Sequence, residues 1–373
     1  MKLTNSLLLL MTATLVLSGC NSVPKKTDTT VSLKNAYIKD FYIGTALNQS
    51  QIEESNPMVN SLISKEFNSI TPENIMKSMY THPEKDIFDF KLCDKYVAFG
   101  EKHKMFIHGH TLIWHSQLPP WMSQVKDSTD MADVMTKHIS TIVSNYKGRI
   151  NSWDVVNEAL NEDGTLRKSI FLKTYGKDYL THAFKLAAKA DPKTDLYYND
   201  YNLCTPKKRK GAVELVKNLQ KNGAKIDGVG EQGHWHLNTP SLEEIEQTIL
   251  DFSALGVKVA ITELDISVLP NPKNVVGADV NQRAEASEKM NPYPKALPDS
   301  IQKQLADRYE AIFKIFLKHK DKISRVTLWG VNDGQTWLND FPIRGRTNHP
   351  LLFDREFKPK KAYYSILNLK EKK

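Results

Sequence analysis

The chain has 373 residues, of which 40% are hydrophobic and 25% are charged, and its formal net charge is +8. These proportions are ordinary for a folded globular protein and exclude a disordered or fibrous chain. The positive charge does not indicate a nucleic-acid partner, because Lys and Arg are spread along the sequence, whereas nucleic-acid binders gather them on one surface. The longest basic run, residues 207–210, opens a predicted helix, and we interpret it as a solvated helix face.

The N-terminal segment has the pattern of a secretory signal. Lys2 gives it a positive start, residues 7–17 are apolar but too short to span a bilayer, and small residues precede Cys20. A cysteine at this place resembles the lipobox of bacterial lipoproteins, in which the thiol is acylated and the cysteine becomes the mature N-terminus. We therefore expect residues 1–19 to be a lipoprotein signal peptide and Cys20 to be lipidated. The alternative is an ordinary cleaved signal.

The segment after Cys20 is polar as far as residue 32, and we expect it to be a flexible tether. Residues 33–373 contain no second linker or composition shift, which indicates a single domain. No later apolar run approaches the roughly 20 residues of a membrane span, so the protein is expected to be anchored by lipid and not to cross the membrane. We expect secretion across the inner membrane and anchoring at the cell envelope, on its periplasmic side or at the cell surface. Cys93 and Cys204 are expected to be free thiols.

Short strand-like runs alternate with longer segments that carry helical signals. In one of these segments Ser241 and Glu244 form a capping box, and Gly256 ends the predicted helix. Eight strands alternating with helices imply parallel pairing and closure into a (β/α)8 TIM barrel of the α/β class, whose active site lies at the carboxyl ends of the strands. The predicted strands are residues 41–46, 67–70, 105–110, 150–156, 195–199, 228–232, 257–264 and 325–331.

Two of the predicted strands end in a carboxylate. The fourth strand leads into Asn157 and Glu158, and the seventh leads into Glu263. The ends of these strands face each other across a barrel, and two carboxylates facing across a cleft are what glycosidic bond hydrolysis needs. The amide of Asn157 is placed to hydrogen-bond a sugar 2-hydroxyl, a contact that strengthens in the transition state.

With these motifs in place, residues 35–370 resemble glycoside hydrolase family 10, the barrel xylanases. The resemblance is specific because its motifs fall in order on successive strands. They are Glu73-Asn74 with Lys77, the segment 109–117, the segment 153–158, the segment 198–202, Gln232-Gly233-His234, Thr262-Glu263-Leu264-Asp265, and Trp329-Gly330-Val331 with Trp337 beyond it.

The resemblance implies a retaining endo-1,4-β-xylanase that needs no cofactor or metal. Glu263 would be the nucleophile and Glu158 the acid/base, while His234 and Asp265 would orient Glu263 and keep it ionised. A retaining outcome requires the two carboxyl groups to lie about 5–5.5 Å apart. The partners implied are xylan and xylo-oligosaccharides, and a monomer is the default expectation.

Sugar binding combines aromatic rings that lie against the apolar faces of a pyranose with polar groups that bind its hydroxyl rim. The candidate rings are Trp114, Trp329 and Trp337. By analogy with the family, Trp337 would crowd the sugar C5 and favour xylose over glucose. The polar contacts that the family places in the sugar subsites are Glu73, Asn74, Lys77, His110 and Gln232.

The chain departs from the family pattern in places. Ser78 stands where many relatives carry a bulky residue, and Glu231 adds an acid beside Gln232. If Glu231 points inward, its charge would raise the pKa of Glu158. The segment 269–299, rich in Asn and Pro, is too long for an ordinary connection and is expected at the rim of the cleft.

Three other functions compete with this interpretation. His108, His110 and His115 could belong to a metal-dependent barrel hydrolase, but the His-x-His of such enzymes lies on the first strand, not the third. A glycan-binding lipoprotein that has lost catalysis would fit the aromatic residues, but both carboxylates remain in this chain. A related β-1,4-glucanase is the nearest alternative among enzymes.

Overall fold

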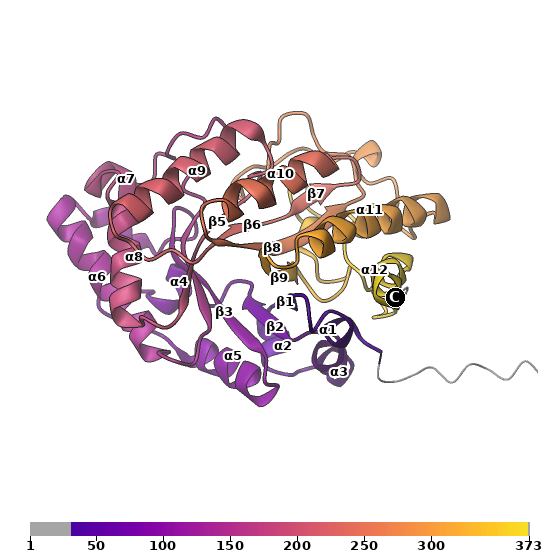
Figure 1. The fold of residues 1–373 in the computed structure, drawn as a ribbon, viewed down its shortest axis with the longest axis horizontal. Coiled ribbons are helices and arrows are strands. Elements are labelled where there is room, and N and C mark those ends of the chain that lie inside the picture. Colours follow the sequence, from indigo (N-terminus) through magenta and orange to yellow (C-terminus); the bar gives the residue numbers. More distant parts are fainter. Residues whose placement is uncertain (1–30, 372–373) are drawn as a thin grey trace, which may run out of the picture. The chain divides into compact units, whose positions relative to one another are not determined.

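The alternating pattern folds into a closed barrel of eight parallel strands (Figure 1), which confirms the predicted TIM barrel. The computed structural model describes residues 31–371. Neighbouring strands pair in the order β6-β5-β4-β3-β2-β1-β9-β8, and β6 also pairs with β8, which closes the ring. The barrel strands are β1 Tyr42–Leu47, β2 Ser69–Pro72, β3 Phe106–Trp114, β4 Ser152–Asn157, β5 Asp195–Asp200, β6 Gly228–Glu231, β8 Lys258–Ser267 and β9 Ile323–Leu328.

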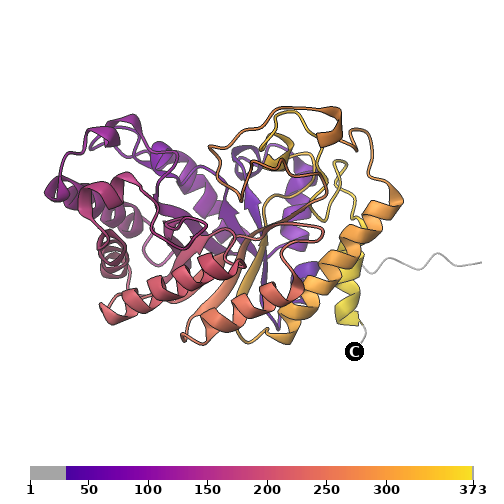
Figure 2. The same ribbon diagram turned by 90° about the horizontal axis from the view of Figure 1, so that it is seen from above.

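Helices surround the strands on the outside of the barrel (Figures 1 and 2). The capping box predicted at Ser241 and Glu244 opens α10, and Gly256, with φ +77°, follows that helix. The α-helices are α1 Leu33–Ala36, α2 Gln49–Ile52, α3 Pro57–Glu66, α4 Ser78–Thr81, α5 Lys91–Lys102, α6 Ser128–Asn145, α7 Ile170–Tyr175, α8 Tyr179–Ala190, α9 Pro206–Lys221, α10 Leu242–Ser253, α11 Asp299–Lys318 and α12 Lys361–Glu371, and the 3-10 helices are η1 Pro120–Gln124, η2 Glu288–Met290 and η3 Trp337–Asn339.

Two strands extend three or more residues further than the sequence predicts, and both extensions lead into the mouth of the barrel. β3 continues to Trp114 and β8 continues to Ser267. A further short strand, β7 His234–His236, pairs in parallel with the end of β8, so that His234 lies opposite Asp265. The longer β8 therefore carries the nucleophile candidate inside a hydrogen-bonded strand and brings His234 beside it.

The centre of the barrel is filled by large side chains. Trp153 of β4 is almost fully buried, and its ring lies against Gly109 of β3, where an added Cβ would come within 2.2 Å of the ring. Only glycine leaves this space, so β3 and β4 can approach closely. Arg325 of β9 is also buried, with its guanidinium 4.6 Å from the ring centre of Tyr197. This packing holds the strand ends in fixed positions.

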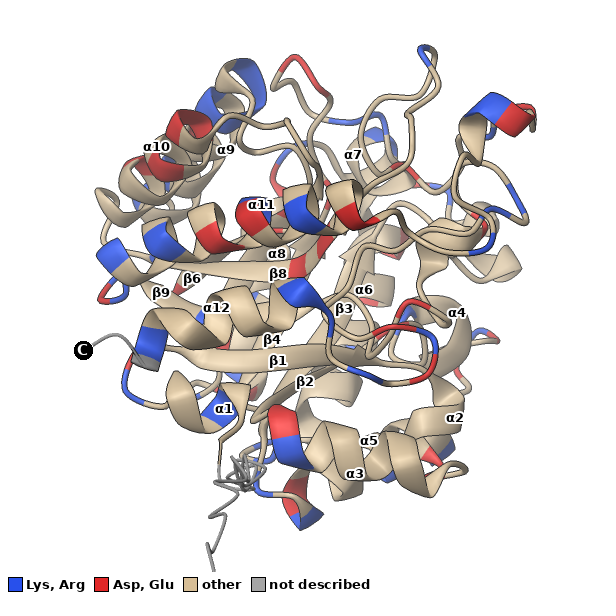
Figure 3. Cartoon of the chain, turned by 90° about the vertical axis from the view of Figure 1, so that its right-hand side faces the viewer, with Lys and Arg blue, Asp and Glu red and all other residues tan. Residues whose placement is uncertain are grey.

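Charges on the face shown in Figure 3 are interspersed, with acidic and basic positions on the same helices. The interpretation of residues 207–210 as a solvated helix face is wrong for two of its members. Lys208 is fully buried and forms ion pairs with Asp200 (2.9 Å) and Glu162 (3.1 Å), and Arg209 is mostly buried against Asp251. Their carboxylate partners lie on other elements, with Asp200 on β5, Glu162 after β4 and Asp251 on α10.

Several expectations concern the chain outside the barrel strands. The predicted signal peptide, Cys20 and most of the tether lie outside the described residues, whereas residues 32–371 form one compact unit. Among the helices that the structure describes, none combines the length and the apolar character of a membrane span. Cys93 and Cys204 are free and buried, as predicted.

Candidate active site

A cavity of about 630 Å³ lies at the carboxyl ends of the strands and opens to solvent. Of the residues predicted for catalysis and sugar binding within the described chain, all but Asp265 line it, and Asp265 lies behind His234. The lining residues are Glu73, Asn74, Lys77, His110, Trp114, Gln117, Asn157, Glu158, Gln232, His234, Glu263, Ala278, Val280, Trp329 and Trp337.

Glu263 is buried beside a charged histidine. Nε2 of His234 lies 3.1 Å from its carboxylate, and Nδ1 of the same ring lies 3.0 Å from Oδ1 of Asp265. Burial lowers the pKa of His234, but the charge and contacts of Asp265 and Glu263 outweigh it and raise that pKa to about 10. Burial raises the pKa of Glu263. The hydrogen bond from His234 and nearby positive charge lower that pKa by a larger amount, so the net shift is downward. Glu263 is therefore kept as a carboxylate.

Glu158 has different neighbours. Its carboxyl oxygens accept hydrogen bonds from neutral donors, namely Nε1 of Trp114 (2.9 Å), Nε2 of Gln232 (3.1 Å) and Nδ2 of Asn157 (3.2 Å). Burial raises the pKa of Glu158, the bonds from Gln232 and Trp114 partly offset this, and the charge of Glu263 raises it again. The net shift is upward, which favours the protonated form that a general acid needs.

The two carboxylates are joined by a chain of amides. Nδ2 of Asn199 donates both to Oδ1 of Asn157 and to Oε1 of Glu263, each at 2.9 Å, and Asn157 in turn contacts Glu158. Oδ1 of Asn199 accepts from the hydroxyl of Thr262 at 2.7 Å. These bonds fix the side chains between β4, β5 and β8, so both carboxylates face one cavity in a defined arrangement.

The predicted polar contacts from β2 form one wall of the cavity. Nζ of Lys77 donates to Oδ1 of Asn74 at 2.9 Å and lies 4.8 Å from the ring centre of Trp114. Burial raises the pKa of Glu73 and lowers that of Lys77, and the carboxylates facing Lys77 oppose its shift. Ser78, the smaller residue that follows, is buried beside the carbonyl of Gln117.

The predicted aromatic residues are held by specific partners. Nε1 of Trp337 donates to Oδ2 of Asp265 at 2.8 Å, and its ring stacks on Phe341 with the ring centres 4.4 Å apart. The ring of Trp329 meets His110 edge-on at 5.6 Å, and His110 is fixed through Asp154 at 2.9 Å. The two tryptophans therefore form rigid surfaces at the mouth.

The structure adds residues that sequence reasoning did not assign to the site. Asn199 and Gln117 line or bridge the cavity, and both lie in motifs at strand ends, so the rule that selected Glu158 could have selected them. Ala278 and Val280 come from the long segment expected at the rim, and they do lie there. Small and apolar residues in an irregular loop give no sequence signal of this kind.

Glu231 does not point into the cavity. Its buried carboxylate accepts from the backbone of Gly233 (3.2 Å) and from Nε1 of Trp235 (3.3 Å). Alternation along β6 turns the neighbouring Gln232 inward and Glu231 outward. Because Glu231 does not point inward, its charge is not expected to raise the pKa of Glu158 directly.

Two of the three histidines of the competing metal-site interpretation, His108 and His110, contact the same carboxylate oxygen of Asp154, at 3.0 and 2.9 Å. His108 contacts Ser152 and Asp154 inside the barrel, where the guanidinium of Arg325 lies 3.1 Å from it. Within residues 31–371, no group of three or more His, Cys, Asp or Glu side chains is arranged to hold a metal ion.

Comparisons with known proteins agree with this geometry. The sequence model of glycosyl hydrolase family 10 matches residues 32–369. Endo-1,4-beta-xylanase A of Xylanibacter ruminicola is 44% identical over 345 residues, covering 91% of this chain and 94% of that protein. An endo-1,4-beta-xylanase of Geobacillus stearothermophilus is 38% identical, covering 94% of this chain and all of that one.

Solved structures give the same result. A GH10 endoxylanase from a sugarcane soil metagenome superimposes with a TM-score of 0.87 at 48% identity, covering 90% of this chain and 99% of that one. Xylanase 10B of Thermotoga petrophila in complex with xylobiose superimposes with a TM-score of 0.80 at 32% identity, covering 92% and 98%.

Proposed function

The chain belongs to glycosyl hydrolase family 10, and we propose that Glu263 and Glu158 carry out its reaction as nucleophile and acid/base. The protein is an endo-1,4-β-xylanase that hydrolyses xylan, and reaction in this family retains the configuration of the sugar. The assignment of roles is carried by one observation. Glu263 lies against the charged His234, whereas Glu158 accepts its hydrogen bonds from neutral donors.

In the first step, the Glu263 carboxylate attacks the anomeric carbon and forms a glycosyl ester. The glycosidic C–O bond breaks, and the leaving oxygen takes the proton of Glu158. The raised pKa of Glu158 and the lowered pKa of Glu263 supply the two protonation states that this step requires. The bond from Asn199 to Glu263 fixes the attacking carboxylate in direction.

In the second step, water replaces the first leaving group. Esterification removes the negative charge of Glu263, which is one cause of the raised pKa of Glu158. Glu158 is then a stronger acid and stays ionised, so it can take a proton from the attacking water. The ester C–O bond breaks, Glu263 returns to the carboxylate, and Glu158 is reprotonated.

Substrate binding is assigned by the same proposal. Glu73, Asn74 and Lys77 would bind sugar hydroxyls on the β2 wall, and His110 and Gln232 would bind those next to the reacting sugar. Trp329 and Trp337 would hold the sugar faces, and the fixed ring of Trp337 would exclude a hydroxymethyl group at C5. Trp114 has a second task in this proposal, because its Nε1 donates to Glu158.

We also propose that the protein is a lipoprotein of the cell envelope, acylated at Cys20 after removal of residues 1–19. Support comes from the small residues before Cys20 and the polar segment behind it. Labelling cells with a radioactive fatty acid tests this. The full chain should be labelled and the Cys20→Ser variant should not, whereas equal labelling of both would contradict acylation at Cys20.

A product ladder tests the proposed function. The protein starting after Cys20 is incubated in parallel with xylan and with a soluble β-1,4-glucan, and products are separated by length over time. Early release of short xylo-oligosaccharides, with little from the glucan, is expected. Preferential cleavage of the glucan would contradict the selectivity assigned to Trp337, and binding without products would contradict the roles of Glu158 and Glu263.

A further inference from the structure

Glu158 lies just beyond β4 in an unusual backbone conformation. Its φ is +56°, in the left-handed region that residues other than glycine rarely adopt. Its N–H donates to the carbonyl of Asn199 at 2.8 Å, which ties the entry to this turn to β5. A conformation of this kind persists only when surrounding groups hold it, so the contacts after Glu158 determine where its carboxyl group points.

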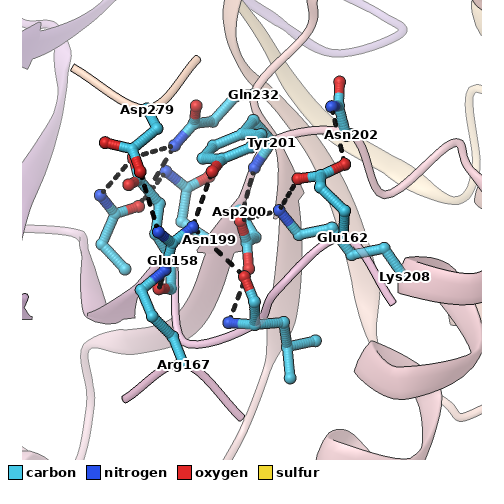
Figure 4. Close-up of polar contacts among 12 residues, drawn as sticks. Glu158, Glu162, Arg167, Asn199, Asp200, Tyr201, Asn202, Lys208, Gln232 and Asp279 are labelled. Atoms are coloured by element: carbon cyan, nitrogen blue, oxygen red, sulfur yellow. Dashed lines mark hydrogen bonds and ion pairs between the residues drawn. The ribbon is translucent and has the colours of Figure 1, made fainter. Parts of the chain in front are cut away.

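Arg167 provides most of those contacts, as Figure 4 shows. Its Nε donates to the carbonyl of Glu158 at 3.2 Å, its guanidinium to the carbonyl of Leu160 at 3.3 Å, and its own N–H to the carbonyl of Ala159 at 2.7 Å. One residue thus binds three consecutive carbonyls of the segment that begins at the acid/base. Because the guanidinium is planar and rigid, these bonds fix orientation as well as distance.

The remaining guanidinium N–H groups of Arg167 lead away from Glu158. One donates to the hydroxyl of Tyr201 at 2.6 Å, and another pairs at 3.1 Å with Asp279. Asp279 belongs to the segment between β8 and α11, residues 268–298, which we call the rim loop. Its two neighbours, Ala278 and Val280, line the catalytic cavity. The ion pair therefore joins the wall of the cavity to the backbone of the acid/base.

The rim loop also packs against the ring of Tyr201. Gly277, with φ +68°, lies so close to the Tyr201 ring that an added Cβ would come within 2.4 Å of it. Nζ of Lys208 lies 3.6 Å from the centre of the Tyr201 ring. This buried ammonium group also forms an ion pair with Asp200. Asp200 accepts in turn from the N–H groups of Tyr201 (2.9 Å) and Leu160 (3.3 Å). A second path thus leads from Tyr201 to the turn after Glu158.

We propose that Arg167 is a positioning residue for Glu158, and that Asp279 of the rim loop completes this function by holding the guanidinium in place. This inference rests on the proposed role of Glu158 as acid/base. It implies that a loop distant from β4 in the sequence controls how well the leaving oxygen is protonated. Neither Arg167 nor Asp279 needs to touch the substrate for this effect.

The test compares two substrates that share the same sugar part and differ in whether the leaving group needs a proton. Phenyl β-xylobioside has a poor leaving group, whereas 2,4-dinitrophenyl β-xylobioside has one that departs without protonation. Glu158→Ala sets the reference, with an expected loss of about 10²- to 10⁴-fold in kcat/KM for the phenyl substrate and a much smaller loss for the other. Equal losses on both substrates in this reference variant would contradict the role of Glu158 itself.

With that reference established, Asp279→Asn should lower kcat/KM for the phenyl substrate about tenfold and leave that for the dinitrophenyl substrate within about twofold. Equal losses on both would show that Asp279 only shapes the binding wall, and no loss on either would show that it is irrelevant. Both outcomes overturn the inference. Asp251→Asn is the matched control, because Asp251 pairs with Arg209 at 2.8 Å in a similar partly buried setting, and it should change neither rate.

The order of action is tested with Arg167. Arg167→Met should show the same dependence on leaving group, and adding Asp279→Asn to it should cause no further loss, because Asp279 acts through Arg167. Additive losses would contradict this order. Arg167→Lys, which keeps the charge but loses the fork of donors, replaces Arg167→Met if the latter does not fold, as judged by its circular dichroism and Tm.

Discussion

The two carboxylates that we propose as catalytic, Glu263 and Glu158, differ in what holds them and in the charge that they face. Glu263 lies within strand β8, at a register shift in its pairing with β9; its N–H donates to the carbonyl of Gln232 at 2.7 Å, and it faces a positively charged ring. Glu158 lies beyond the end of β4 in a left-handed turn and faces neutral donors. The sheet positions the nucleophile, whereas side chains position the acid/base, so the acid/base is the more sensitive to changes outside the barrel strands.

The largest effect is expected from removing the nucleophile. Glu263→Gln cannot form the glycosyl ester, so kcat on xylan should fall by about 10⁴-fold or more. Release of reducing ends measures this, and an unchanged circular dichroism spectrum shows that the variant is folded. Appreciable activity in the purified variant would contradict the role of Glu263.

The next effect concerns the charge beside Glu263. His234→Gln removes the hydrogen bond and the positive charge that lower the pKa of Glu263, so that pKa should rise. The enzyme needs Glu263 ionised, so the acidic limb of the kcat/KM profile should move to higher pH by about one unit or more. His319→Gln, which removes a partly buried contact to Glu246 at 2.6 Å, is the matched control and should leave the limb in place. An unmoved acidic limb in His234→Gln would contradict the assignment.

A smaller effect of the same kind is expected at Glu158. Gln232→Leu removes a donor that lowers the pKa of Glu158, so that pKa should rise further. The first step needs Glu158 protonated and is lost as pH rises through its pKa, so the alkaline limb of kcat/KM should move upward, by less than about one unit. Trp114→Phe should act in the same direction. A downward movement of the alkaline limb in both Gln232→Leu and Trp114→Phe would contradict the effect that we assign to these two donors on the pKa of Glu158.

The smallest effect on activity is expected at Glu231, whose carboxylate points away from the cavity. Glu231→Gln should leave the pH profile of kcat/KM unchanged, and a moved profile would contradict this orientation.

Burial raises the pKa of Glu231 to about 7, above the value of 4.5 in an unfolded chain. The folded state then holds a proton that the unfolded state releases, so wild-type stability should fall as pH rises from about 4.5 to 7, by roughly 3 kcal/mol. Denaturant unfolding at several pH values should show a steeper fall in stability over this range in the wild type than in the Glu231→Gln variant.

The alternation of strands and helices predicted the barrel, and the rule that polar residues follow barrel strands led to Glu158 and Glu263. Both carboxylates line the cavity, whereas Asp154 and Glu231, which also lie on strands, are buried against hydrogen-bonding partners, so the rule alone does not separate the two cases. It did not reveal β7, because three residues carry too short a pattern, although this strand places His234 beside Asp265.

Lys208 shows a different limit of sequence reasoning. Four consecutive basic residues at the start of a helix look solvated, because the carboxylates that pair with Lys208 and Arg209 lie on other elements of the fold. Glu162 lies 46 residues before Lys208 and comes into range only when the barrel folds. Arg167 and Asp279 are separated by 112 residues for the same reason. Contacts of this kind depend on the folded geometry and leave no local pattern.

The pairing of β1 with β9 also bears on the time at which the protein can fold. The strand ring closes only when residues 323–328 reach Tyr42–Thr45, so a chain still emerging from the ribosome or an export channel cannot complete it. Until then β1 and β8 each have an edge without the β9 neighbour, and edges of this kind invite pairing with other chains. The chain should therefore depend on folding assistance until almost its full length has emerged, and truncations before β9 should aggregate.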